Sequence, residues 1–318
     1  MDTRELAARL AKGDRRAVAK AISLVENDGP GAAGLLRAIG PRLGHAFVIG
    51  VTGPPGTGKS SLVDRLIESY RKKGLKVGVV ALDPTSPLTG GALLGDRVRM
   101  LDHTQDYGVY IRSMASRGWA GGLSAAVSDV IQILDAAGMD VIMVETVGIG
   151  QSDTDIIRVA HSVVVVLMPG MGDDVQASKA GLMEIGDLYV VNKADLAGAD
   201  DMVVDLLAMV KDQKGRNPSV LKVSATRREG IDAVVSVIER TRSRFLSPSP
   251  SGGGREIRLK SIRGMITERA RKKALAKFAD ADVGDLAEKV AGHRVTIDDA
   301  ADELLGEKGG RRGRKRRA

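Results

Sequence analysis

The 318-residue sequence lacks cysteine, and aromatic residues make up only 3% of it. Without cysteine the chain can form no disulfide bond, no thiolate metal site and no cysteine nucleophile. It also lacks any run of about 18 apolar residues, which a membrane-spanning helix would need, and its first residues, MDTRELAARLAKGDRR, contain no apolar signal segment. These absences lead us to expect a cytoplasmic protein that does not enter a membrane.

The remaining composition is typical of a soluble globular protein, with 43% hydrophobic and 28% charged residues. The formal net charge is +8, but the last eight residues, RRGRKRRA, carry six positive charges, so the rest of the chain is close to +2. A short basic tail can bind nucleic acid, although such tails are commonly solvated chain ends. Because no aromatic residues are interleaved with these charges for stacking on bases, we do not expect a nucleic-acid partner.

Short β-branched segments alternate with helix-length segments through the middle of the sequence. The apolar runs are mostly continuous, which favours strands buried on both faces of a sheet; they are FVIGVT, KVGVVAL, VYIRSM, VIMVET, SVVVVLM, LYVVNK and SVLKVSA. Two helix-length segments between them, SSLVDRLIESYRKKG and GLSAAVSDVIQILDAAG, each end at glycine, a common helix stop. The alternation predicts an α/β fold with a doubly wound, mainly parallel sheet.

The segments outside this pattern are helical. Residues 4–26 predict an amphipathic helix, with a break near Gly13 and Asp14 as the alternative to one continuous helix. The segment SPSPSGGG has the composition of a linker, and helical segments follow it. We therefore expect an N-terminal helical extension over residues 1–45, the α/β domain over 46–246, a C-terminal helical arm over 255–306 and a disordered basic tail over 307–318.

The segment GPPGTGKS fits the phosphate-binding pattern G-x-x-x-x-G-K-[ST] and lies between the predicted strand FVIGVT and a predicted helix. Glycines let the backbone N–H groups wrap around phosphates, and the helix N-terminus adds its positive dipole end. The lysine of this pattern neutralises phosphate oxygens, and the hydroxyl of the next residue ligates Mg²⁺. The predicted phosphate-binding residues are Gly53, Pro54, Pro55, Gly56, Thr57, Gly58, Lys59, Ser60 and Ser61.

The segment VVNKADL addresses which base is bound, a question that a P-loop alone leaves open. In GTPases with the motif N-K-x-D, the aspartate accepts hydrogen bonds from guanine N1–H and the exocyclic amine. Adenine presents the opposite pattern at that edge and would leave the carboxylate badly paired. The motif predicts guanine binding by Asn192, Lys193 and Asp195, and Ser224 and Ala225 resemble the loop that contacts guanine O6 in such GTPases.

Two acidic residues lie at the carboxyl ends of predicted strands, where ligands bind in a doubly wound sheet. Glu145 ends one strand and is followed three residues later by Gly148, an E-x-x-G pattern where many GTPases have D-x-x-G. In those enzymes the acid holds Mg²⁺ through water and the glycine amide contacts the γ-phosphate. Asp83 ends the second predicted strand, in KVGVVALD. Both acids are therefore predicted to serve Mg²⁺ and the reaction.

A third acid, Asp96, follows the glycine-rich segment PTSPLTGGALLG. It would join the site if that loop folds over the phosphates, and an acid at a helix N-terminus is the alternative. Because Mg²⁺ takes oxygen ligands and keeps several waters, we predict Ser60, Asp83, Asp96 and Glu145 as its ligands, directly or through water. Lys59, Asp83, Asp96 and Glu145 form the predicted catalytic set, in which Arg97, Arg99, Arg112 and Arg117 are further candidates for stabilising charge or contacting a partner.

Five segments together resemble the methylmalonyl-CoA mutase-associated GTPases of the MeaB/ArgK type, once named as LAO/AO transport system kinases. The segments are TGPPGTGKSSLVDRL, LDPTSPLTGGALLGDRVRM, IRSMASRGWAGGLSAA, VETVGIGQSDTDI and VVNKADL, and the likeness runs from about residue 4 to residue 245. The resemblance implies a P-loop GTPase domain over residues 46–246 that binds GTP or GDP with Mg²⁺. It further implies a homodimer formed partly through the C-terminal arm.

The same resemblance implies a chaperone of a cobalamin-dependent acyl-CoA mutase. GTP binding and hydrolysis would gate delivery of adenosylcobalamin to methylmalonyl-CoA mutase, and the chaperone would protect or reactivate that enzyme. GGALLGDR and part of GIGQSDTD would then be switch segments. Since phosphoryl transfer depends on positioning, glycine-rich loops predict slow intrinsic hydrolysis that a bound partner accelerates.

Other functions fit the residues less well. A metallochaperone GTPase needs a Cys/His cluster, whereas this chain has no cysteine and its four histidines, His45, His103, His161 and His293, are widely spaced. A transporter-associated kinase would need a module that recognises the phosphate acceptor, and none is apparent. An ATPase of the MinD type carries a second lysine near the start of the P-loop, where this chain has Pro54.

Overall fold

The computed structural model of the chain describes residues 2–83, 103, 105–115, 125–148, 152–171, 181–211, 218–247, 253–275, 280–292 and 294–305. Within the chain, contacts define two compact units, Met1–Met265 and Ile266–Ala318. Asp96, one of the predicted Mg²⁺ ligands, lies outside the described residues, as do Arg97, Arg99 and Arg117.

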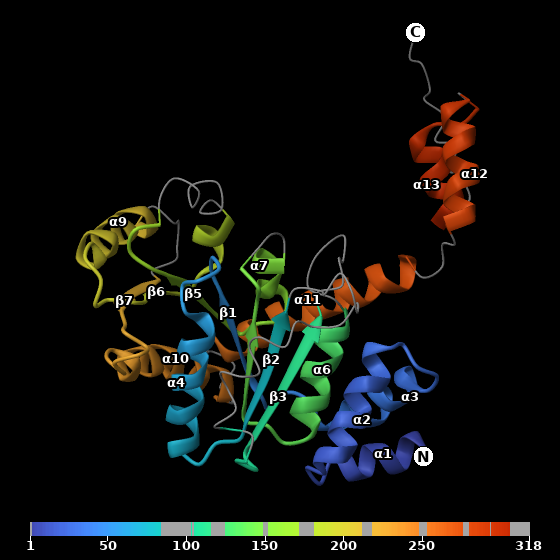
Figure 1. The fold of residues 1–318 in the computed structure, drawn as a ribbon. Coiled ribbons are helices and arrows are strands. Elements are labelled where there is room, and N and C mark those ends of the chain that lie inside the picture. Colours follow the sequence, from blue (N-terminus) through green and yellow to red (C-terminus); the bar gives the residue numbers. More distant parts are fainter. Residues whose placement is uncertain are drawn as a thin grey trace. The chain divides into compact units, whose positions relative to one another are not determined.

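The seven apolar runs form the seven parallel strands of one sheet. They are β1 (Phe47–Thr52), β2 (Val77–Asp83), β3 (Val109–Ala115), β4 (Val141–Glu145), β5 (Ser162–Leu167), β6 (Leu188–Val191) and β7 (Ser219–Lys222). Their order is β3-β2-β4-β1-β5-β6-β7, so β1 lies at the centre with three strands on each side (Figure 1). The predicted α/β fold with a doubly wound parallel sheet is confirmed.

Helices cover both faces of this sheet, which explains why the apolar runs are continuous rather than alternating. Every residue of β1, β2, β4, β5 and β6 is buried. In β5, Val163 and Val165 belong to one hydrophobic cluster, while Val164 and Val166 belong to a second cluster on the opposite face. Apolar residues of these strands therefore contribute to a core on whichever face their side chains point.

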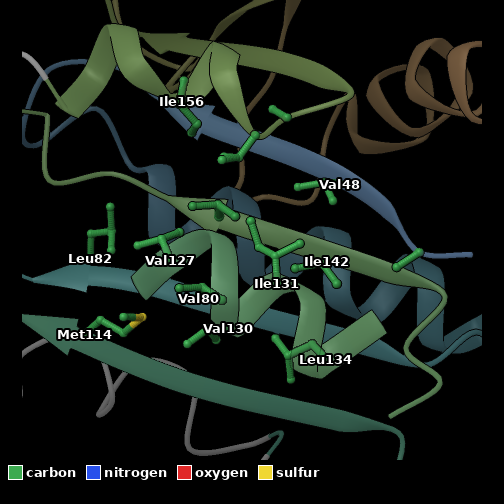
Figure 2. Close-up of a cluster of buried hydrophobic side chains, with 14 of the residues drawn as sticks. Val48, Val80, Leu82, Met114, Val127, Val130, Ile131, Leu134, Ile142 and Ile156 are labelled. Atoms are coloured by element: carbon green, nitrogen blue, oxygen red, sulfur yellow. The ribbon is translucent and has the colours of Figure 1, made fainter. Parts of the chain in front are cut away.

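The first cluster lies under α6 (Ala125–Ala136), α9 (Ala199–Lys211) and the N-terminal helices α1 (Thr3–Leu10), α2 (Arg15–Glu26) and α3 (Ala32–Ile39), the last followed by the 3-10 turn η1 (Gly40–Arg42). Figure 2 shows Val127, Val130, Ile131 and Leu134 of α6 facing the strand residues Val80, Leu82 and Ile142. The second cluster lies under α4 (Lys59–Lys72) and α10 (Ile231–Leu246).

The N-terminal extension is broken near Gly13 and Asp14, one of the two possibilities that the sequence left open. Gly13 has a φ of 74°, and the side chain of Asp14 caps α2 by accepting from the N–H groups of Arg16 and Ala17. Glycine adopts that backbone conformation without strain, and aspartate is a favoured cap. Residues 3–26 therefore form two helices, α1 and α2, which pack on each other and on α3 and α6 (Figure 1).

Polar contacts join this extension to the sheet domain. Arg15 Nη1 donates to the carbonyl of Val109 at 2.8 Å, and Arg112 forms an ion pair with Glu26. The buried carboxylate of Asp135 accepts from three successive N–H groups, those of Gly44 (2.6 Å), His45 (3.2 Å) and Ala46 (2.9 Å). Arg112, a candidate for stabilising charge or contacting a partner, is paired with Glu26 of the extension in this structure.

Helix α11 (Gly254–Leu275) spans the boundary between the two units, and its residues up to Met265 belong to the first. There Ser261 Oγ lies 3.0 Å from His161 Nε2, while Met265 packs against the first hydrophobic cluster. Gly264 allows a close approach, because a Cβ at this position would lie 2.1 Å from the carbonyl oxygen of Arg158. Arg158 ends the turn η3 (Ile156–Arg158), which follows the short helix α7 (Ser152–Asp155).

The second unit contains α12 (Asp280–Ala291) and α13 (Ile297–Leu305). These helices pack on each other, with Leu286 and Ala300 buried and an ion pair of 2.9 Å between Lys289 and Glu303. Across the part of the chain that the structure describes, no helix has both the length and the apolar character needed to cross a membrane.

Candidate functional site

The loop between β1 and α4 contains the predicted phosphate-binding residues. Gly53, Gly56 and Gly58 have φ angles of 139°, 78° and 89°, a region that side chains other than glycine rarely adopt. A Cβ on Gly53 would lie 2.0 Å from the carbonyl oxygen of Val166, and one on Gly58 would lie 2.3 Å from Asn192 Nδ2. Backbone conformation therefore favours glycine at all three positions, and close contacts with β5 and the base motif also require it at Gly53 and Gly58.

Lys59 occupies the first turn of α4, and its ammonium group is buried beside the loop. Its Nζ donates to the carbonyls of Gly53 (2.9 Å), Pro54 (3.1 Å) and Val147 (3.2 Å). Gly148 lies against the same atoms, since a Cβ there would be 2.3 Å from the Gly53 oxygen and 2.7 Å from Lys59 Nζ. The structure thus brings the E-x-x-G segment and the phosphate-binding loop together.

Three of the four predicted metal ligands, Ser60, Asp83 and Glu145, lie at the carboxyl edge of the sheet. Ser60 Oγ donates to Glu145 Oε1 at 2.7 Å, and both side chains are buried. Asp83 is 1% exposed and ends β2, the strand next to β4; Ala81 of β2 pairs with Glu145, so Asp83 lies two residues farther along. A serine hydroxyl and two carboxylates form an all-oxygen donor set of the kind that suits Mg²⁺.

A buried polar network beside Gly148 was not predicted from the sequence. Asp153 Oδ1 accepts from Thr146 Oγ1 (2.5 Å), Thr52 Oγ1 (3.2 Å) and the Gly148 N–H (3.1 Å). Burial raises the pKa of Asp153, although the hydrogen bonds from Thr146 and Thr52 act in the opposite direction. In this structure the Asp153 carboxyl group therefore occupies the Gly148 N–H, the same donor that is expected to contact the γ-phosphate. The only sequence signal was its position in QSDTD, shortly after Gly148.

The base motif is joined to the phosphate-binding loop by one side chain. Asn192 Nδ2 donates to the carbonyl of Thr57 at 2.8 Å, while its Oδ1 accepts from the Ala225 N–H at 3.1 Å. Lys193 has a φ of 56°, an uncommon conformation for a lysine, which turns the chain at the end of β6. Residues far apart in the sequence are thus held in one arrangement at the carboxyl edge of the sheet.

Asp195 lies beside the loop that carries Ser224 and Ala225. Ser224 Oγ donates to Asp195 Oδ1 at 2.8 Å, and Arg227 Nη2 lies 3.6 Å from Asp195 Oδ2. The hydrogen bond from Ser224 lowers the pKa of Asp195, as do the charges of Arg227 and Lys193, while desolvation opposes them. Asp195 is therefore held as a carboxylate, the form that accepts hydrogen bonds from guanine. The sequence did not predict a role for Arg227.

Comparison with known proteins places these features in a family. The family model described as methylmalonyl Co-A mutase-associated GTPase MeaB matches residues 18–278. A Pyrococcus abyssi protein named as a GTPase is 53% identical over 251 residues, covering 77% of each chain. GTPase ArgK of Escherichia coli is 40% identical over 237 residues, covering 71% of this chain and 72% of its own.

Two further proteins extend the comparison. A mitochondrial methylmalonic aciduria type A homolog of Caenorhabditis briggsae is 34% identical over 71% of this chain and 60% of its own. The crystal structure of an LAO/AO transport system kinase superposes with a TM-score of 0.69 at 26% identity, covering 96% of both chains. The resemblance inferred from the sequence motifs is confirmed: the chain belongs to the family of methylmalonyl-CoA mutase-associated GTPases of the MeaB type.

Proposed function

We propose that the chain hydrolyses GTP to GDP and phosphate with Mg²⁺ and uses this cycle as a chaperone of a cobalamin-dependent acyl-CoA mutase. Guanine nucleotide binding and GTPase activity are properties of the family. The observation that carries the proposal for this chain is the 2.7 Å hydrogen bond between Ser60 and Glu145 beside the buried Lys59. It joins the phosphate-binding loop to the E-x-x-G segment at the point where the γ-phosphate and its metal are expected.

Each residue then has a distinct role. The backbone N–H groups of the loop from Gly53 to Ser61 bind the phosphates, and the Lys59 ammonium exchanges carbonyl partners for phosphate oxygens. Ser60, Asp83 and Glu145, with Asp96, would hold Mg²⁺ directly or through water. When bound, the metal supplies positive charge to the phosphate oxygens. Asn192, Lys193 and Asp195, with Ser224 and Ala225, select guanine.

The proposed partner is a mutase such as methylmalonyl-CoA mutase. Two names support it: the family is described as mutase-associated, and one relative is named a methylmalonic aciduria type A homolog. GTP binding and hydrolysis would gate adenosylcobalamin delivery and allow protection or reactivation of the mutase. We further propose that the chain acts in the cytoplasm as a homodimer, with residues 255–306 as the dimer arm.

The proposal is tested with the full-length chain and Glu145→Gln. Removing the carboxylate charge should lower Mg²⁺-dependent GTP hydrolysis by about tenfold or more, while Glu303→Gln, an exposed acid on α13, should behave as wild type. Equal hydrolysis rates for wild type and Glu145→Gln would contradict the assigned role.

The chaperone role needs a separate experiment. Purified chain should form a complex with a cobalamin-dependent acyl-CoA mutase in a manner that differs between GDP and a non-hydrolysable GTP analogue, and the mutase should accelerate GTP hydrolysis. If candidate mutases neither bind nor change the hydrolysis rate, the GTPase assignment remains and the chaperone proposal is wrong.

A further inference from the structure

Two consecutive arginines lie in the loop that follows β7, and they contact different parts of the molecule. Ser224 and Glu229 form an antiparallel bridge with two backbone hydrogen bonds of 3.1 Å, which closes the loop between them. Gly230 allows the return of the chain, since a Cβ there would lie 2.3 Å from the carbonyl oxygen of Lys222. The loop that carries both arginines is thus defined by backbone contacts.

The two side chains form separate ion pairs. Arg227 Nη2 lies 3.6 Å from Asp195 Oδ2, whereas Arg228 Nη2 lies 3.1 Å from Glu68 Oε1 on α4. Both arginine side chains are exposed to a similar degree, 59% and 63%. They therefore provide a matched pair in which only one contacts the acid of the base motif.

The two oxygens of Asp195 have different neighbours. Oδ1 accepts the Ser224 hydroxyl at 2.8 Å, and Oδ2 faces the guanidinium of Arg227. Guanine offers two donors to such a carboxylate, N1–H and the exocyclic amine, so both oxygens must lie in the plane of the base. The Ser224 hydroxyl holds only one of the two oxygens, so the carboxylate can still rotate. A second contact is needed to stop that rotation.

We propose that Arg227 is a positioning residue for guanine selectivity, which orients Asp195 Oδ2 so that the carboxylate accepts both guanine donors at once. This inference rests on the proposed guanine site at Asp195. An inosine nucleotide lacks the exocyclic amine and presents only N1–H, so it can use the single oxygen that Ser224 fixes. Arg227 therefore contributes to GDP binding more than to IDP binding.

The effect on affinity is modest because the pair is exposed to solvent. Ion pairs of this kind contribute little to stability, and loss of one corresponds to a change in affinity of about two- to fivefold. The informative quantity is consequently the ratio of the IDP and GDP dissociation constants rather than either constant alone. A general disturbance of the loop would weaken both nucleotides equally and leave this ratio unchanged.

The experiment measures GDP and IDP binding with Mg²⁺ by calorimetry for the full-length chain and three variants. Arg227→Gln should weaken GDP binding about two- to fivefold, and IDP binding by less than half as much. Arg227→Lys should restore most of the lost GDP affinity. Arg228→Gln should leave the ratio as in wild type. The inference is overturned if Arg227→Gln weakens both nucleotides equally or matches Arg228→Gln. If wild type binds neither nucleotide, the proposed guanine site itself is wrong.

Discussion

At the scale of single residues, Asp153 combines burial with several hydrogen bonds to one oxygen. Its pKa is raised in the folded chain, so protonation is favoured by folding. The stability gained from binding this proton is fully present below the ordinary aspartate pKa. It is lost as the pH rises through the pKa of Asp153 in the folded chain. At neutral pH the buried negative charge therefore opposes folding, while the acceptor role of Oδ1 toward Thr52, Thr146 and Gly148 supports it.

Two substitutions separate these contributions. Asp153→Asn keeps an acceptor oxygen without the charge. Its free energy of unfolding at pH 7 should therefore equal or exceed that of wild type. Asp153→Ala leaves buried hydroxyls without their acceptor and should lose about 1–3 kcal/mol. Urea denaturation at pH 7 measures both. An Asp153→Asn variant as unstable as Asp153→Ala would show that the charge itself is needed.

His161 gives a second prediction at this scale. Its Nδ1 accepts the Val48 N–H at 2.9 Å, so the neutral ring carries its proton on Nε2 and donates to Ser261 Oγ at 3.0 Å. Burial, with the charges of Arg258 and Lys260, lowers the pKa of His161 to about 4. Because the unfolded chain binds the proton more readily, the stability from neutral His161 is complete above about pH 6.5 and is lost as the pH falls toward 4.

The expected loss between pH 7 and pH 5 is about 1–2 kcal/mol in the free energy of unfolding. His161→Gln, which cannot titrate, should be less stable at pH 7 but should lose less on acidification. His45→Gln serves as the control, because His45 is exposed. An identical pH dependence in wild type and His161→Gln would rule out this histidine as the source.

The sequence predicts those site residues whose role is visible in a short local motif. Lys59, Ser60, Glu145 and Asp195 belong to short motifs next to strands, and the parallel sheet brings strand ends to one edge. Asp153 and Arg227 lacked such a signal. Asp153 acts only because α7 folds back on β1 and β4, and Arg227 acts through a loop closed by the bridge from Ser224 to Glu229.

At the scale of elements, α11 approaches the sheet domain more closely than an alanine would permit. In Gly264→Ala the new Cβ would meet the backbone of Arg158, with its carbonyl oxygen at 2.1 Å, so the helix or η3 must move. We expect the variant to lose about 1–3 kcal/mol of stability, as overpacked sites do. Chemical denaturation followed by circular dichroism measures the change.

The matched control is Gly284→Ala on α12, where a Cβ would meet nothing within 4 Å. Alanine is the better helix former, so this variant should be unchanged or more stable by about 0.5–1 kcal/mol. If Gly264→Ala behaved like Gly284→Ala, the close contact between α11 and η3 would be contradicted.

Strands were easier to predict than helix boundaries for a physical reason. The five strands β1, β2, β4, β5 and β6 are buried on both faces, so their apolar runs stand out in the sequence, as in FVIGVT of β1. Helix α11 instead begins at Gly254, the last residue of the segment SPSPSGGG, whose composition indicated a linker. Its glycines Gly254 and Gly264 lie against the backbone of Arg244 and Arg158, and these contacts have no local sequence signature.

At the scale of the whole molecule, every described residue of the proposed nucleotide site lies in the first unit, Met1–Met265. A ligand that binds the folded state stabilises the unit that contains its site, by about 2.7 kcal/mol when its concentration is 100 times the dissociation constant. GDP with Mg²⁺ should therefore raise the unfolding temperature of the first unit. The hairpin of α12 and α13 should respond much less, since none of its residues belongs to the site.

Hydrogen exchange of the full-length chain resolves the two units in one experiment. Amides of β1, β4 and α4 should exchange more slowly with GDP and Mg²⁺, whereas those of α12 and α13 should be unchanged, and ATP should have no effect on either set. Equal protection of both units by GDP would mean that nucleotide binding stabilises the chain as one cooperative body. That result would contradict the division at Met265 as an energetic boundary, because a ligand can stabilise only what unfolds together with its site.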